Sequence, residues 1–469
     1  MKRIQRVDLI DGPILPALLS FAFPILLSNI FQQLYNTSDV MIVGRFLGQK
    51  SLAAIGATSA IFDLIVGFAV GVGNGMGIII ARNYGAKNDD QLRKSVAATA
   101  VIGGILSLFV ISIGVVGLYP LLQFLGTPPA IIAQSYLYIS TIVNGVAVTF
   151  AYNLCAGLLR AVGDSLAALY FLIIAAVLNI LLDLYFITQL HLGVQSAGIA
   201  TIIAQSFSAL LCFFYIRKKV PFLLPNRNDF VWDQRLYQDL ISQGLTMGLM
   251  SSIVSIGTVI LQSAINKLGM TIISAQISAR RIMSFALLPM TAISSSMTTF
   301  TSQNFGAKQF RRIQQGVKQA CLLSLLWSVF VAILLFFTSP FLTSLISGST
   351  NPNLIANASL YLQISSCFYP VLGCLLILGN SLQGIGRKLT PLISSFIELT
   401  GKILFVLFII PHTGYIEGIL CEPLIWVPMT LQLSSSWTNP RHSSTFNTWN
   451  DSSLTRSFTD HHNPLIRHY

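Results

Sequence analysis

Long apolar stretches alternate with short polar segments along the chain from Gly12 to Leu433. A helix needs about 20 apolar residues to cross the hydrocarbon core of a bilayer, and these stretches reach that length. We therefore predict an all-α integral membrane protein with twelve spanning helices. The predicted spans are residues 13 to 42, 52 to 81, 95 to 118, 130 to 155, 163 to 188, 192 to 216, 238 to 265, 271 to 301, 316 to 337, 354 to 379, 389 to 411 and 413 to 433.

The composition supports a membrane protein. The 469 residues are 54% hydrophobic and only 9% charged, whereas soluble domains carry about 25% charged residues. The first span follows the basic head "MKRIQR", but it is too long for a signal peptide and has no convincing small-residue cleavage site. We expect it to be retained as a helix.

The basic residues fall mainly on one side of the predicted spans. With the amino terminus in the cytoplasm, 19 of the 28 Lys and Arg residues, Arg160 among them, lie on the cytoplasmic side, and the opposite loops hold only Arg45, Lys50 and Lys267. Lys and Arg are enriched in cytoplasmic loops. We therefore predict a multi-pass protein of the cell membrane with both termini in the cytoplasm, and the net charge of +12 does not indicate nucleic acid.

Motifs of enzymes and redox sites are missing from the sequence. All six cysteines lie in apolar stretches and none forms a CxxC pair, so we expect them to be packing residues. The chain has no HExxH, no GxSxG and no phosphate-binding Gly-Lys loop. We predict that the protein is not an enzyme and has no cofactor.

Two pairs of loops indicate an internal duplication. "ARNYGAKNDDQLRKSV" from Ala81 matches "SQNFGAKQFRRIQQGV" from Ser302 at an offset of 221, and "GLLRAVGD" from Gly157 matches "NSLQGIGR" from Asn380 at an offset of 223. Six spans per half place both halves in the same orientation, related by an axis along the membrane normal. We predict an N-terminal six-helix lobe at 1 to 216, a cytoplasmic linker at 217 to 235, a C-terminal six-helix lobe at 236 to 433 and a polar, disordered tail at 434 to 469.

Two parallel bundles around a cleft can open to either side in turn and so move a solute without forming a pore. On these features alone, the alternative is a duplicated bundle with another task, such as a membrane enzyme or a scaffold. Polar residues inside the spans are therefore the next evidence to consider.

Acidic residues inside the spans are few, and each needs a reason, because an Asp at mid-bilayer costs about 2.5 to 3.5 kcal/mol. Asn179 and Asp183 lie four residues apart and share one helix face. Such a polar ladder can take up and release a proton or hold a small cation. Asp39 ends the first span within the polar stretch "QQLYNTSDVMIVGRFLG". Alternatively, Asp39 lies near the outer membrane interface, where it is solvated or paired with Arg45.

At these residues the chain resembles the multidrug and toxic compound extrusion (MATE) transporters, in their prokaryotic DinF/NorM-like branch. An N-x-x-D-x-x-x-V-G-R-x-L-G stretch runs from Asn36 to Gly48, basic "GA" loops recur at Gly85 and Gly306, and the N-x-x-x-D pair of the fifth helix is matched by Asn179 and Asp183. The resemblance covers about residues 10 to 433.

The resemblance implies a multidrug efflux antiporter that exchanges organic, often cationic and amphipathic, solutes for inward protons or sodium by alternating access. The residues it assigns to ion coupling are Asp39, Asp183, Asn179, Asn153, Thr201 and Tyr138. If sodium is the coupling ion, its ligands are expected to be Asp39, Asn179, Asp183 and Thr201. Weaker candidates for contact with the solute are Gln32, Gln33, Tyr35, Arg280 and Arg281.

The second half departs from the family pattern. At the offset of 223, Lys402 and Val406 stand where the first half has Asn179 and Asp183, and we expect Lys402 to pair with Glu398 four residues earlier. The resemblance therefore implies no sodium site in the second lobe. For Arg280 and Arg281, snorkelling or pairing with a carbonyl is the alternative to a place in the cleft.

A second transport function remains open at this stage. A lipid-linked oligosaccharide flippase of the same superfamily usually lines its cleft with several basic residues, and the candidates here are only Arg280, Arg281 and Lys402. For the antiporter we expect drug-like small molecules and the lipid bilayer as partners, no nucleic acid, and a monomer.

Overall fold

The computed structural model describes residues 6 to 438, and over that range the chain is helical without a strand. The first half contains α1 (Ile14–Phe46), α2 (Gly48–Gly85), α3 (Asp89–Phe124), α4 (Pro129–Asn144), α5 (Val146–Ala161), α6 (Ser165–Thr188) and α7 (Gln195–Lys219). The second half contains α8 (Gln234–Ile265), α9 (Met270–Gly306), α10 (Phe310–Ser347), α11 (Pro352–Cys367), α12 (Tyr369–Gly384), α13 (Leu389–Leu404), α14 (Ile410–Thr413) and α15 (Tyr415–Thr438). Short helical turns are η1 (Pro221–Leu223), η2 (Arg227–Asp229), η3 (Asn266–Leu268) and the π-helical η4 (Phe405–Ile409).

The number of membrane spans agrees with the sequence pattern. Ten of the helices in the described range are long and apolar enough to cross a bilayer, and two bent pairs, α4 with α5 and α11 with α12, bring the number to twelve when each pair is one span. The predicted all-helical membrane fold is therefore confirmed.

Some helices begin at a side-chain acceptor for the free backbone N–H groups of the first turn. The carboxylate of Asp164 accepts a hydrogen bond of 3.0 Å from the N–H of Ala167 at the start of α6. The carboxylate of Asp233 accepts from the N–H groups of Arg235 and Leu236 at the start of α8. These caps fix the positions at which α6 and α8 begin.

The two halves repeat each other in detail. The bend between α4 and α5 is 47° and occurs at Gly145, and the bend between α11 and α12 is 55° and occurs at Phe368, which lies 223 positions later. Lys87 and Lys308, 221 positions apart, both adopt left-handed backbone angles, with φ of 52° and 58°. A non-glycine residue rarely adopts that conformation. The duplication seen in the sequence therefore extends to unusual backbone geometry.

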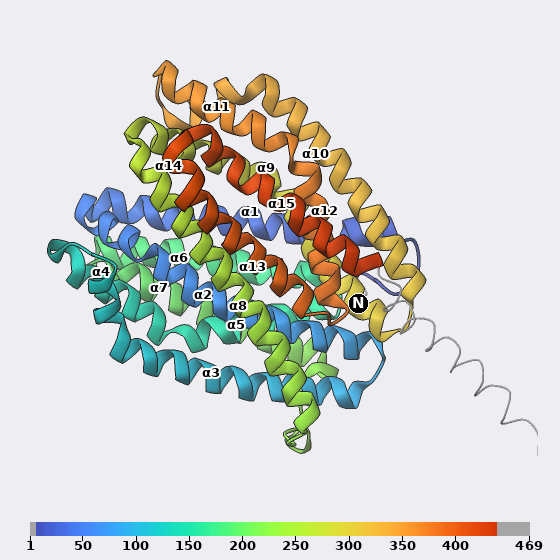
Figure 1. The fold of residues 1–469 in the computed structure, drawn as a ribbon. Helices are drawn as coiled ribbons and strands as arrows, with labels where there is room; N and C mark the ends of the chain where they lie inside the picture. Colours follow the sequence, from blue (N-terminus) through green and yellow to red (C-terminus); the bar gives the residue numbers. More distant parts are fainter. Residues whose placement is uncertain (1–5, 439–469) are drawn as a thin grey trace, which may run out of the picture.

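In Figure 1 most of the first half, in blue to green, forms the lower part of the view and most of the second half, in yellow to red, the upper part, while the yellow-green α8 extends to the bottom. Helices α1 and α2 of the first half pack on α8 and α9 of the second. At the α2–α8 contact, Gly71 and Gly75 face Gly244 and Gly248, and a Cβ atom on Gly75 would lie 2.6 Å from the carbonyl oxygen of Gln243. Paired small residues four apart let two helix backbones approach closely.

A second close approach lies at the end of the molecule that carries the turns at Lys87 and Lys308, which we call the basic end. A Cβ atom on Gly85, the last residue of α2, would overlap the backbone of Gln303 on α9. A Cβ atom on Gly306, the last residue of α9, would overlap the backbone of Arg82 on α2. The repeated "GA" loops thus bring the two halves into backbone contact and close the basic end.

The last helix extends further than the sequence pattern indicated. Helix α15 continues to Thr438, five residues into the predicted tail. The hydroxyl groups of Ser434 and Ser436 donate to carbonyls one turn earlier, and Trp437 packs against the core of the second half. Serine can satisfy its hydroxyl within a helix in this way. The rest of the predicted disordered tail, residues 439 to 469, lies outside the described residues.

Candidate functional site

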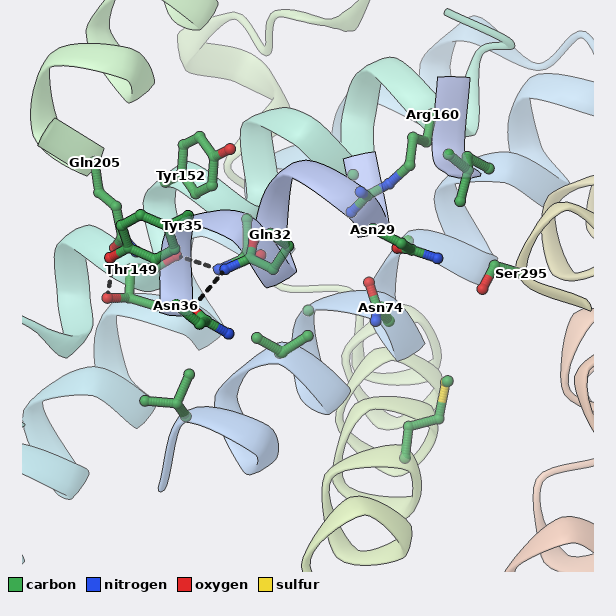
Figure 2. A pocket seen from close by; sticks show the side chains of 18 of the residues that line it. Asn29, Gln32, Tyr35, Asn36, Asn74, Thr149, Tyr152, Arg160, Gln205 and Ser295 are labelled. Carbon is green, nitrogen blue, oxygen red and sulfur yellow. Dashed lines mark hydrogen bonds between the residues drawn. The ribbon is translucent and has the colours of Figure 1, made fainter. Parts of the chain in front are cut away.

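A polar cavity of about 660 Å³ lies between the two halves (Figure 2). Most of its lining comes from α1, α2, α5 and α7 of the first half, and α9 closes it from the second. Polar side chains in the lining include Asn29, Gln32, Tyr35, Asn36, Asp39, Asn74, Tyr138, Thr149, Asn153, Arg160, Thr201, Gln205, Ser295, Thr298, Ser302 and Asn380. The dense polarity of the first span is explained, since its polar face looks into the cavity.

Three predicted site residues form a hydrogen-bonded chain across α1, α6 and α7. The side-chain amide of Asn179 donates to the hydroxyl of Thr201 over 3.3 Å. The hydroxyls of Thr201 and Tyr35 share a hydrogen bond of 2.9 Å. Thr201 also donates to the carbonyl of Ala197 over 2.9 Å, which holds its side chain in place. The predicted polar ladder is therefore connected to the wall of the cavity through Tyr35.

Asp183 lies behind this wall and Asp39 lies on it. Asp183 is 0% exposed and Asn179 is 1% exposed, whereas Asp39 lines the cavity. The carboxyl groups of Asp39 and Asp183 are close enough to interact electrostatically. Within residues 6 to 438 Asp39 forms no ion pair with Arg45, so the alternative pairing is not observed.

The two acids share an important property. Both carboxyl oxygens of Asp183, the Oδ1 atom of Asp39 and the Oδ1 atom of Asn179 are buried and have no hydrogen-bond partner in the described structure. A buried acceptor without a partner is rare in proteins and calls for an explanation such as a bound proton, water or ion. Two neighbouring buried carboxylates also repel each other, and a proton or a cation between them removes that repulsion.

Tyr138 and Asn153 occupy different positions relative to the acids. Tyr138 on α4 lines the cavity and lies within electrostatic range of Asp39 and Asp183. Asn153 on α5 also lines the cavity, but its amide donates to the backbone carbonyl of Thr149 over 2.8 Å and not to the ladder. The structure therefore brings Asp39, Asp183, Asn179 and Thr201 together, with Tyr138 beside them and Asn153 further along the wall.

Only some of the weaker candidates for contact with the solute line the cavity. Gln32 and Tyr35 line the cavity, whereas Gln33 does not. Arg280 lies outside the cavity because its Nη2 atom donates to Glu422 over 2.9 Å, and Arg281 is exposed on the surface of α9. The expectations for Arg280 were a place in the cleft, snorkelling or a carbonyl partner, and the structure shows instead an ion pair with Glu422.

The acid and base pair predicted for the second half is confirmed. Lys402 is 2% exposed, and its Nζ atom lies 2.7 Å from Glu398 and 3.2 Å from Glu422. With Arg280, these residues form a buried network of two bases and two acids. A buried charge is tolerated when it is paired in this way.

Sequence reasoning missed one charged residue of the cavity. Arg160 was counted with the basic loops, but it lies in the last turn of α5 and lines the cavity together with Thr149, Asn153 and Gly157. The spacings of four, four and three residues along this helix could have revealed the shared face. Asp39 and Arg160 are the two charged residues in the lining.

A duplicated set of twelve spanning helices, with a polar cavity between its two halves, defines a multi-pass membrane transporter. A family model described as MatE matches residues 24–185 and matches again at residues 247–407. The chain belongs to the MatE family. The double match agrees with the repeat that the loops and bends display.

Similar proteins cover almost the whole chain. The Probable multidrug resistance protein YoeA of Bacillus subtilis is 27% identical over 85% of this chain and 87% of its own length. An FAD transporter of Shewanella oneidensis is 25% identical over 88% of this chain and 91% of its own length. Among solved structures, a MOP superfamily transporter from Pyrococcus furiosus has a TM-score of 0.85 at 22% identity, covering 95% of this chain and 99% of that one.

Proposed function

We propose that the protein is a secondary active efflux antiporter of the cell membrane, which exports organic, often cationic and amphipathic, solutes in exchange for inward protons or sodium ions. The observation that carries this proposal is the buried Asp183 with two unpartnered oxygens, next to Asp39 on the wall of the inter-lobe cavity. The naming of a similar Bacillus protein as a probable multidrug resistance protein supports the same solute class.

The positions of the two acids suggest how ion and solute compete. A proton or sodium ion bound between Asp183 and Asp39 cancels one of their two negative charges, relieves the repulsion between them and supplies a partner for oxygens that lack one. A cationic solute in the cavity reaches Asp39 only, because Asp183 is covered. The incoming ion therefore reduces the negative charge that attracts the cationic solute, which weakens its binding and favours its release.

The hydrogen-bonded chain from Asn179 to Tyr35 supplies a route from ion binding to helix movement. Tyr35 belongs to α1, and Thr201 and Asn179 belong to α7 and α6, so the chain joins three helices of one lobe. Ion binding at Asn179 and Asp183 changes the partners available to Thr201. We propose that α1 repacks in response, which changes the shape of the cavity wall.

The state described here is closed at the basic end, where Gly85 and Gly306 hold α2 and α9 in contact. With both termini in the cytoplasm, as the distribution of Lys and Arg favours, this is the cytoplasmic end. Release of solute to the outside and uptake of the ion from the outside fit such a state. Alternating access then requires that the contacts of Gly85 with Gln303 and of Gly306 with Arg82 open.

The cavity wall suits solutes of varied shape. Apolar side chains such as Phe62, Val66, Val70 and Met247 alternate with amides and hydroxyls along it. Broad-specificity binding surfaces commonly use flexible apolar residues of this kind. The small number of charges in the lining also argues for loose binding rather than recognition of one compound.

The proposal is tested with the full chain reconstituted into liposomes. We expect ethidium to move against its gradient when a proton gradient, or instead a sodium gradient, is imposed, and we expect Asp183→Asn to abolish this coupling. Asp90→Asn, which alters an exposed acid near the basic end, serves as the matched control and should transport like the parent protein.

The gradients also separate the alternatives. Transport driven by protons alone assigns a protonation site, and transport driven by sodium alone assigns Asp183 as a cation ligand. If neither gradient moves a solute while the protein remains folded, the antiporter proposal is wrong. A flippase function would then be examined with lipid-linked oligosaccharide.

A further inference from the structure

We propose that the cavity contains a separate subsite for an anionic oxygen group, a carboxylate or a phosphate, formed around Arg160. This inference rests on the proposed transport function and deepens it, because it adds solutes that carry a negative group as a preferred class. Figure 2 shows Arg160 among the labelled side chains of the cavity. The preferred solutes would thus be elongated and amphipathic, with an acid group at one end.

The first argument is that the guanidinium group of Arg160 has no protein partner. Arg82, Arg93 and Arg280 each face a carboxylate in the described structure, at 3.6, 3.4 and 2.9 Å. Arg160 forms no such ion pair and donates no side-chain hydrogen bond within residues 6 to 438, although it lies inside a spanning helix pair. Arg160 lies one residue before the end of the spanning pair, and a cation there that lines a cavity without a protein partner is a functional candidate.

The end of the helix does not account for this arginine. A cation in the last turn of a helix is favoured by the helix dipole and by free carbonyl groups. Here, however, the carbonyl of Ala161 already accepts a hydrogen bond from Gln303, the carbonyl of Leu159 accepts from Asp164, and the carbonyl of Arg160 itself accepts from Gly163. The N–H groups of the guanidinium are left to face the cavity.

The surroundings of Arg160 are suited to an anion. The hydrogen bond from Gln303 to Ala161 brings the last turns of α9 beside the end of α5, so residues of both halves approach this end of the cavity. Asn74 contributes an exposed amide to the same lining. A guanidinium group presents paired N–H donors that match a carboxylate or a phosphate, and neutral hydroxyls and amides can complete the shell.

The subsite is distinct from the acid pair. The hydroxyl of Ser165 donates to the carbonyl of Phe21, so the chain just after α5 lies beside the early part of α1, and Asp39 lies 18 residues, about 27 Å of helix, further along α1. Within residues 6 to 438, no other charged residue lines the cavity. A solute can therefore place a cation near Asp39 and an anion near Arg160 without bringing these groups together, or occupy the Arg160 subsite alone.

Equilibrium binding to the purified full chain tests this without any ion gradient. The probes are norfloxacin, its ethyl ester, which lacks the carboxylate, FAD, which carries phosphates, and ethidium, which has neither group. We expect norfloxacin to bind about tenfold more tightly than its ester, because a hydrogen bond to a charged group contributes that much or more. Arg160→Gln should abolish the difference, and Arg160→Lys should retain part of it.

Ethidium binding and the variant Lys267→Gln, which removes an exposed cation outside the cavity, should both be unaffected. If Arg160→Gln loses binding of FAD only, the recognised group is the phosphate. If it loses binding of norfloxacin only, the recognised group is the carboxylate. Equal binding of norfloxacin and its ester to the parent protein would overturn the inference, as would an equal loss of ethidium binding in Arg160→Gln and Arg160→Lys.

The same measurements separate this inference from the proposed function. If the carboxylate preference is present but no gradient drives transport, the antiporter proposal fails and the subsite stands. If transport is coupled to an ion but Arg160→Gln leaves all four probes unchanged, the subsite is refuted and the antiporter proposal stands.

Discussion

The side-chain amide of Gln303 on α9 donates a hydrogen bond of 2.7 Å to the backbone carbonyl of Ala161 at the end of α5. This bond joins the two halves of the molecule at the basic end, and Gln303 is only 1% exposed there. It lies beside the backbone contact between Gly85 and Gln303. Any movement that opens the basic end must break both interactions together, so they form one barrier to opening.

The first prediction concerns Gly306→Ala. The added methyl group would overlap the backbone of Arg82, which cannot move aside as a flexible side chain can. Overpacking of this kind costs about 1 to 3 kcal/mol, so we expect the closed basic end to lose population to an open one. Distances between spin labels at residues 88 and 309 would report the change. Gly104→Ala, where the new methyl group meets open space, should leave the distances unaltered.

The second prediction separates the roles of the two acids. Asp39 lines the cavity and Asp183 is covered, so Asp39→Asn should weaken binding of ethidium by about tenfold or more, while Asp183→Asn should leave it nearly unchanged. Both variants should lose ion-driven transport. Equilibrium binding and liposome transport, measured on the same preparations, check this division, and equal binding losses in both variants would contradict it.

The third prediction concerns the chain that joins Asn179, Thr201 and Tyr35. Thr201→Val removes the hydroxyl that both neighbours contact, and Tyr35→Phe removes one of these contacts. Each change should slow coupled transport about 2- to 12-fold, the range expected for one hydrogen bond. Because the two changes remove the same bond, the double variant should be little slower than Thr201→Val alone. Additive effects in the double-mutant cycle would show that the two hydroxyls act independently.

The fourth prediction is a test of stability. Glu422→Gln removes the carboxylate that both Arg280 and Lys402 contact, and it leaves buried positive charge only partly compensated by Glu398. Removing one partner of a buried ion pair typically costs about 3 to 5 kcal/mol. We expect a clear fall in the thermal unfolding temperature in detergent. The matched change Glu417→Gln, on the same helix but outside the network, should have a much smaller effect.

Most of the fold could be predicted because it depends on local composition. Stretches of about 20 apolar residues were sufficient to predict twelve helices. The matching loops at Gly85 and Gly306 were sufficient to predict that these helices form two halves. The bends at Gly145 and Phe368 were not predicted, because an average over a window of apolar residues does not register a break of one residue. Gly145 itself, and Pro370 two residues after the second bend, were the available signals.

The site was predictable where its partners are close in sequence. Asn179 with Asp183, and Glu398 with Lys402, are four residues apart, and the structure places each pair on one helix face. Arg280 finds its partner Glu422 at a separation of 142 residues, which no spacing rule can reveal. Arg160 was missed for a related reason, because its place in the cavity depends on the position at which α5 ends against α9.

The network of Arg280, Lys402, Glu398 and Glu422 has a consequence for how voltage acts on the protein. Its two positive and two negative charges cancel within one bundle, so moving that bundle carries no net charge from this network through the electric field. The charges that ion binding changes, at Asp39 and Asp183, belong to the other bundle. A membrane potential contributes about 2.3 kcal/mol per elementary charge per 100 mV. The N-terminal half, which holds Asp39 and Asp183, should therefore respond to voltage on ion binding, whereas this network of the C-terminal half contributes no net charge movement.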